Sequence, residues 1–165
     1  MFTYSFRWDI IATNLPFLMS GLQTTLIVSA LTLVLAMMGG LVLASLDMSR
    51  YWPLRAIGIG FGEIVRNTPI LVQLLWAYYV LPIVFGINLS AFAALVIGLS
   101  IYSSAFIGEV YRAGIQAVPK GHREAAQVLG MTPFQSFRRI VLPQAVRMTL
   151  PPLAANFVQL IKYSS

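Results

Sequence analysis

The first long apolar run in the chain extends from Ile10 to Leu46 and contains no Asp, Glu, Lys or Arg. This run is longer than the roughly 20 residues that an α-helix needs to cross a bilayer. Over the whole chain, 58% of the residues are hydrophobic and 10% are charged, whereas soluble domains carry about 25% charged residues. The sequence therefore predicts an all-α fold, a polytopic bundle of membrane helices.

The apolar runs divide the chain into a tail and a transmembrane domain. Residues 1–19 are predicted to form an N-terminal tail and an interfacial segment, because Asn14 and Pro16 interrupt the first run. Residues 20–165 are predicted to form the transmembrane domain. Its last span is the weakest, since it contains Arg147 and a charge inside a bilayer is costly. The four expected spans cover about residues 20–45, 66–83, 89–110 and 140–161.

The distribution of Lys and Arg predicts the orientation of the chain. Three of these residues lie between the first and second spans, counting Arg66, and five lie between the third and fourth. The tail has only Arg7, and the turn between the second and third spans has none. Because cytoplasmic connections carry the excess of Lys and Arg, we expect the N-terminus outside and residues 119–143 in the cytoplasm.

Residues 119–143 form the long hydrophilic interruption between apolar runs. A short helix is predicted from about His122 to Leu129, and Gly130 follows at the position where glycine commonly ends a helix. A short helix between two turns is a shape that a soluble partner can bind. A second helix is then predicted by a capping-box spacing, with Thr132 at the N-cap, Pro133 at N1 and Gln135 at N3.

Two pairs of opposite charge are spaced i, i+3, which places their side chains on one helix face. They are Glu63 with Arg66 and Glu109 with Arg112, both near the expected cytoplasmic edge. Two interpretations remain open, a structural ion pair and a role in a transport path. The polar candidates for such a path are Arg66, Gln73, Asn156 and Gln159.

The residue inventory gives no support for catalysis or metal binding. The chain has no Cys and one His, His122, and it lacks the Gly-x-x-x-x-Gly-Lys-Ser/Thr loop that cradles phosphates. We therefore expect no catalytic or metal site and no cofactor. The formal net charge of +6 does not indicate nucleic-acid binding, because the positive residues lie in short segments between apolar runs.

Several motifs resemble those of the permease subunits of binding-protein-dependent ABC importers. The resemblance extends from about Ser20 to Ser165, and part of it is typical of the polar amino-acid branch. The cytoplasmic loop carries the pattern of the family's EAA loop, Glu124-Ala-Ala-x-x-Leu129-Gly130 followed by Phe137-x-x-Ile140-x-Leu142-Pro143. The branch motifs are Arg66-Asn-Thr-Pro69 and Glu109-Val-Tyr-Arg-Ala-Gly114.

The resemblance implies a five-helix permease core in the inner membrane of a prokaryote, of which this C-terminally truncated chain would hold four spans. It implies a second permease subunit, identical or related, ATPase subunits, and an extracytoplasmic binding protein that delivers a polar amino acid. The loop would dock on the ATPase as a coupling helix, with Gly130 permitting its turn and Ala125 and Ala126 letting it seat closely. The implied docking residues are Gly121, Glu124, Ala125, Ala126, Leu129 and Gly130.

Two other classes of function are weighed against this one. An ion-coupled secondary transporter or channel subunit would need a charge at the membrane midplane or internal repeats, and the sequence shows neither. A membrane sensor would carry a soluble signalling domain, which these residues do not contain. The loop itself has a simpler interpretation, as a turn that only joins two spans.

Overall fold

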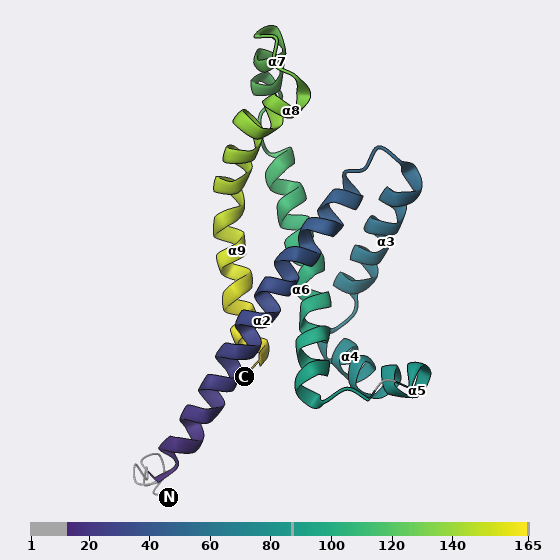
Figure 1. Ribbon diagram of the computed structural model, residues 1–165, viewed down its shortest axis with the longest axis vertical. Helices are drawn as coiled ribbons and strands as arrows, with labels where there is room; N and C mark the ends of the chain where they lie inside the picture. The colour runs from purple at the N-terminus through teal and green to yellow at the C-terminus, as the bar shows by residue number, and fades with distance from the viewer. Residues whose placement is uncertain (1–12, 87, 165) are drawn as a thin grey trace, which may run out of the picture.

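A computed structural model describes residues 13–86 and 88–164, and over these residues the chain is built of helices and their connections (Figure 1). This confirms the prediction of an all-α helix bundle for the described part. The helices are α2 (Leu15–Asp47), α3 (Trp52–Asn67), α4 (Ile70–Leu75), the π-helical turn η1 (Trp76–Val80), α5 (Leu81–Phe85), α6 (Ala91–Gln116), α7 (Lys120–Val128), α8 (Pro133–Ser136), the π-helical turn η2 (Phe137–Val141) and α9 (Leu142–Ser164).

The long helices α2 and α6 form the centre of the bundle, with α9 against α6 and α3 beside α2 (Figure 1). Close approach depends on small residues, because their side chains let helix backbones come near one another. A Cβ at Gly40 would lie 2.7 Å from Cγ2 of Ile107 and 3.0 Å from the backbone nitrogen of Gly108. The small buried residues of α2 recur every three or four positions, at Ser29, Thr32, Ala36, Gly40 and Ala44.

Helix α2 begins earlier than the sequence predicts. It extends without a break from Leu15, so residues 15–19 belong to the helix and not to a separate interfacial segment. Asn14 is the N-cap and Pro16 lies in the first turn, where a proline is tolerated because the first N–H groups have no helical partner. The remainder of the expected tail, residues 1–12, lies outside the described residues.

The expected second span, about residues 66–83, is not one continuous helix. Arg66 and Asn67 complete α3, and α4 begins at Ile70 after a bend of 105° between Trp52–Asn67 and Ile70–Phe85. Thr68 is extended, with φ −99° and ψ 127°, because the residue before a proline is pushed out of the helical region. The polypeptide therefore descends as α3 and turns sharply into α4 and α5 (Figure 1).

Both π-helical turns lie directly before a Leu-Pro step, at Pro82 and at Pro143. A proline inside a helix has no N–H and its ring crowds the carbonyl four residues earlier. A wider turn accommodates this crowding within a continuous helix. The five-residue hydrogen bonds are donated by Leu81 N–H to Trp76 O and by Leu142 N–H to Phe137 O.

Within the described residues, α2 and α6 are long and apolar enough to cross a membrane, and α3 with α4–α5 adds a third such element if the bent pair is one span. Helix α9 is less apolar and contains Pro151 and Pro152. It packs against α6 and α2, and the hydroxyls of Ser29 and Ser164 lie 2.7 Å apart between α2 and α9. The four expected spans thus correspond to two apolar helices, one bent helix pair and one helix shielded on one side.

Candidate functional site

The short helices α7 and α8 form a tip at one end of the molecule, beyond the ends of α6 and α9 (Figure 1). Helix α7 starts at Lys120 after Pro119, two residues before the predicted start. The connection from Asp47 to Trp52, between α2 and α3, lies toward the same end of the molecule. Residues 120–136 are called the tip below.

Local hydrogen bonds fix the turn within the tip. Met131 N–H donates to Ala126 O at 3.0 Å and Gly130 N–H donates to Gln127 O at 2.9 Å, which is the double bond pattern of a Schellman motif. Gly130 has φ +73°, a left-handed conformation that glycine adopts without steric cost. The helix therefore ends where the sequence predicts.

The predicted capping box is also present at the start of α8. Gln135 N–H donates to the Thr132 side chain at 3.3 Å, and Thr132 N–H donates to the Gln135 side chain at 2.9 Å. This reciprocal pair satisfies donors that would otherwise lack a helical partner. Both ends of the turn between α7 and α8 are thus fixed by the chain's own residues.

Large apolar side chains are exposed on the tip. Val128, Leu129 and Phe134 are 89%, 74% and 70% exposed. Such side chains at the end of a membrane protein are candidates for contact with another protein. Val128 and Phe134 were not among the predicted docking residues. The sequence feature that could have indicated them is their position as apolar residues before and after the turn at Gly130.

One predicted docking residue is covered by the chain itself. Ala126 is 0% exposed, and its backbone carbonyl accepts the hydrogen bond from Met131 N–H in the Schellman turn. This side chain is therefore not part of the exposed surface of the tip. The other predicted positions, Gly121, Glu124, Ala125, Leu129 and Gly130, are exposed on the tip.

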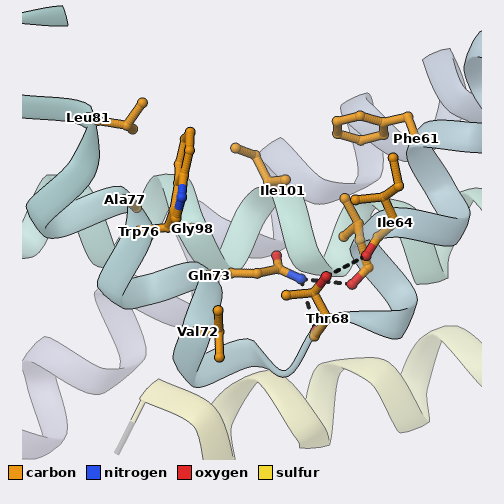
Figure 2. A pocket seen from close by; sticks show the side chains of 11 residues that line it. Phe61, Ile64, Thr68, Val72, Gln73, Trp76, Ala77, Leu81, Gly98 and Ile101 are labelled. Carbon is orange, nitrogen blue, oxygen red and sulfur yellow. Dashed lines mark hydrogen bonds between the residues drawn. The ribbon is translucent and has the colours of Figure 1, made fainter. Parts of the chain in front are cut away.

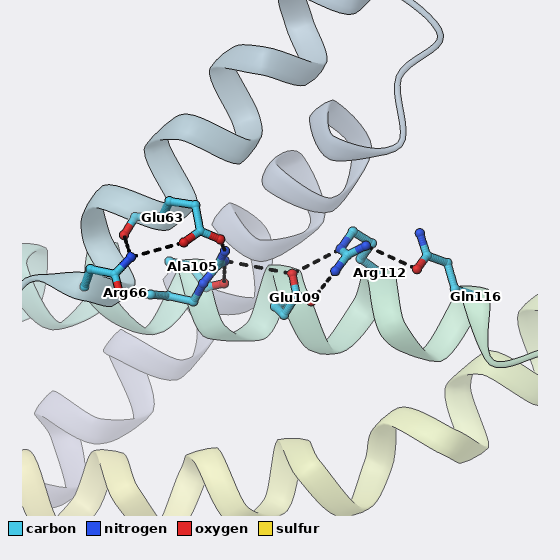
Figure 3. A network of polar contacts seen from close by, with 7 residues as sticks. Glu63, Arg66, Ala105, Glu109, Arg112 and Gln116 are labelled. Atoms are coloured by element: carbon cyan, nitrogen blue, oxygen red, sulfur yellow. Dashed lines mark hydrogen bonds and ion pairs between the residues drawn. The ribbon is translucent and has the colours of Figure 1, made fainter.

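Figure 3 shows a network of polar contacts that links α3 to α6. Arg66 Nη2 donates to Glu63 Oε1 at 2.8 Å, and Arg66 Nη1 donates to Ala105 O at 3.2 Å. The Nη1 atom of Arg66 also lies 4.0 Å from Oε2 of Glu109 on α6. Arg112 pairs with the same Glu109 carboxylate from one turn along. Both predicted i, i+3 pairs are present, and Arg66 joins them across two helices.

The same residues line a small polar cavity of about 150 Å³ together with Asp47, the last residue of α2. Asp47 is 9% exposed, and its Oδ1 has no hydrogen-bond partner in the part of the chain that the structure describes. Three helices therefore bring carboxylates and guanidinium groups to one place, α2 with Asp47, α3 with Arg66 and α6 with Glu109 and Arg112. The sequence did not single out Asp47.

Gln73, another predicted path residue, lies at the bend between α3 and α4. Its Nε2 donates to Val65 O at 2.7 Å and to Thr68 O at 3.1 Å, contacts that span the bend. Figure 2 shows Gln73 beside an apolar cavity of about 400 Å³, with Trp76 on the same wall. Because both donors of its amide are engaged with the backbone, Gln73 stabilises the bend.

The remaining path candidates are not brought to the charged network. Asn156 and Gln159 lie on α9, and Asn156 Nδ2 donates to Pro152 O of its own helix at 3.0 Å. Gln159 is exposed. Neither residue lines the apolar cavity at the bend or the polar cavity between α2, α3 and α6. The four candidates therefore do not form one site within the described residues.

Comparisons with known proteins bear on this arrangement. The family described as binding-protein-dependent transport system inner membrane component matches residues 36–165. The probable glutamine ABC transporter permease protein GlnM of Bacillus subtilis is 38% identical over 157 residues, which are 95% of this chain and 72% of that protein. The L-cystine transport system permease protein TcyB of the same organism is 36% identical over 96% of this chain and 68% of its own length.

Solved structures are similar as well. The structure titled as an amino acid ABC transporter with histidines has a TM-score of 0.91 and 38% identity, over 98% of this chain and 75% of that chain. An inward-facing structure of the MetNI methionine ABC transporter has a TM-score of 0.68 at 19% identity, over 96% of this chain and 74% of its own. At that lower identity the likeness shows the shared fold.

Proposed function

Because this chain belongs to the family of binding-protein-dependent transport system inner membrane components, we propose that it is the permease subunit of an ATP-driven importer for a polar amino acid. The relatives named for glutamine and L-cystine transport support this class of substrate. ATP hydrolysis is assigned to a separate ATPase subunit, and delivery of the substrate to an extracytoplasmic binding protein. A second permease subunit, identical or related, completes the path.

The tip is proposed to dock on the ATPase. The observation that carries this assignment is the exposure of Val128, Leu129 and Phe134 on two short helices whose ends are fixed by capping. Apolar side chains on a rigid support lose little conformational freedom on binding. The docking surface is therefore proposed to consist of Gly121, Glu124, Ala125, Val128, Leu129, Gly130 and Phe134, with Ala126 beneath it.

The charged network is proposed to connect helices α3 and α6 during transport. Alternating access requires two arrangements of a helix bundle whose populations are shifted by ligands. Arg66 Nη1 and Glu109 Oε2 lie 4.0 Å apart. Because this distance is long for an ion pair, a small movement of α3 would shorten or break the contact. Arg66 is therefore proposed as a residue of the moving part, while Gln73 serves the bend.

Co-purification with the cognate ATPase tests the docking proposal. We expect Leu129→Asp to lower the affinity for the ATPase by about tenfold or more. In the complex this apolar side chain would be buried, and the variant would place a desolvated charge there. Tyr51→Asp serves as the control, since Tyr51 is 72% exposed and lies outside the tip. Unchanged binding of Leu129→Asp would refute the docking surface.

Uptake measurements separate the importer from its alternative. An ATP-driven importer reconstituted with its partners accumulates substrate only with ATP. Uptake by the permease alone, driven by an ion gradient without ATP, would instead support an ion-coupled secondary transporter.

A further inference from the structure

We propose that His122 and Arg123 are positioning residues, which fasten α7 to α9 and to α6 so that a movement of α7 displaces both helices together. The proposal rests on the proposed function, because it assumes that α7 is the helix that the ATPase moves. It goes beyond that function in assigning the transmission of movement to two adjacent side chains.

The first link is made by Arg123. Its Nη2 donates to Ile115 O at 2.8 Å. Ile115 is the penultimate residue of α6, and the residue four positions later, which would donate to its carbonyl in a continuing helix, is Pro119. Proline has no N–H, so the guanidinium supplies the donor that the backbone lacks. A positive charge at a helix C-terminus is also favourable.

The second link is made by His122. Its Nδ1 lies 2.9 Å from Gln144 Oε1. Gln144 Nε2 donates to Ile140 O at 2.9 Å, which fixes the direction of the amide and leaves its oxygen facing the imidazole. His122 Nδ1 therefore carries the proton and donates. Ile140 belongs to the π-helical turn η2, so this link reaches the first turns of α9 and the widened turn before them.

The two side-chain links make the attachment of α7 to α6 and α9 stiffer than the backbone turns alone would. Along the polypeptide, α7 follows α6 after a short turn at Pro119, and it is joined to η2 through the turn at Gly130 and α8. Turns of this kind can absorb a displacement by rotating. Side-chain bonds from neighbouring positions to two different helices restrict that rotation. A displacement of α7 then reaches α9 directly, and it reaches α3 through Glu109 of α6 and its partner Arg66.

Alanine variants of both residues test the inference in the assembled transporter with ATPase and binding protein. We expect His122→Ala and Arg123→Ala each to lower uptake per ATP hydrolysed by about fivefold or more, as expected for the loss of a coupling contact. Association with the ATPase should stay at the wild-type level. His122→Gln and Arg123→Lys, which retain a donor, should restore most of the coupling.

Arg50→Ala is the matched control. Arg50 is an exposed arginine in the connection between α2 and α3, toward the same end of the molecule, and we expect it to leave coupling unchanged. A double-mutant cycle with Gln144→Ala provides an independent measurement. If the contact is the cause, the double variant His122→Ala with Gln144→Ala loses no more coupling than either single variant.

The outcomes are distinguishable. Wild-type coupling in both alanine variants overturns the inference, and so does additive loss in the double-mutant cycle. Loss of ATPase association in His122→Ala or Arg123→Ala also overturns it, because these residues would then be contacts of the partner. Failure of the wild-type permease to bind any ATPase would instead contradict the proposed function on which the inference rests.

Discussion

Gly58 and Gly60 lie two residues apart in α3 but differ in what a methyl group would meet. A Cβ at Gly58 would lie 2.8 Å from Cβ of Leu46 and would also meet Oδ1 of Asp47, whereas a Cβ at Gly60 has nothing within 4 Å. Gly58 is therefore required for the approach of α3 to the end of α2. Gly60 has no such role within the described residues.

We expect Gly58→Ala to destabilise the protein by about 1–3 kcal/mol, because the added methyl overpacks the contact between helices. Gly60→Ala should be neutral or stabilising by up to about 1 kcal/mol, since alanine favours a helix. Thermal unfolding of the purified protein in detergent measures both. Equal stability of the two variants would show that the contact between α2 and α3 is looser than described.

Gly130 differs from Gly58 and Gly60, because a glycine is favoured there by the backbone conformation and not by the space around it. A Cβ there has nothing within 4 Å, but φ is +73°. We expect Gly130→Ala to cost about 1–2 kcal/mol in the stability of the turn, and Gly130→Asn to cost less because asparagine tolerates this conformation. Hydrogen exchange of the tip amides measures the difference. Equal protection in the two variants would contradict the conformational explanation.

At the scale of elements, one side chain bonds across the bend between α3 and α4. Gln73 donates to Val65 O and to Thr68 O. Val65 O also accepts from Thr68 N–H at 3.4 Å, so the loss of Gln73 removes a donor chiefly from Thr68 O, and an unpaired carbonyl is costly where water is absent. We expect Gln73→Leu to destabilise the protein by about 1–3 kcal/mol. Gln159→Leu is the control, because Gln159 is exposed on α9. A similar melting temperature for Gln73→Leu and the wild type would show that the bend is held by other contacts.

The sequence predicted those features of the elements that depend on neighbouring residues. Gly130 and the pair Thr132 and Gln135 specify turns by local hydrogen bonds, and both turns are confirmed. The direction of the bend after Arg66 was missed, because a pre-proline residue predicts an interruption but not the angle of 105°. Helix α7 is also too short for its apolar pattern to show that Ala126 faces inward.

The contacts between distant residues were beyond the sequence pattern. The i, i+3 pairs of Glu63 with Arg66 and of Glu109 with Arg112 followed from helix geometry. Their connection through Arg66 and Glu109 depends on how α3 packs on α6, which a single sequence does not specify. The same holds for the burial of Asp47.

At the scale of the whole molecule, the tip and the connection between α2 and α3 lie toward one end of the structure (Figure 1). Lys120 and Arg123 lie on the tip and Arg50 in the connection, whereas the segment between α5 and α6 carries no Lys or Arg. This difference supports the proposal that the tip and the connection face the cytoplasm. The end of α5 and the start of α6 lie at the other end (Figure 1). This orientation would place the N-terminus outside.

Single cysteines test this orientation directly, because the chain has no native Cys. We expect Asn88→Cys to react with a membrane-impermeant maleimide added to intact cells, and Gly121→Cys to react only after the membrane is opened. Both positions are exposed in the structure. The reverse pattern of labelling would contradict the proposed orientation.

The central claim is that the tip contacts an ATPase, and site-specific photo-crosslinking tests it most directly. A photoreactive residue in place of Val128, which is 89% exposed, should form a covalent adduct with the ATPase subunit in the assembled complex. The same residue in place of Tyr51, exposed but outside the tip, should form none. Adducts at Tyr51 alone, or at neither position in a complex that still assembles, would contradict the claim.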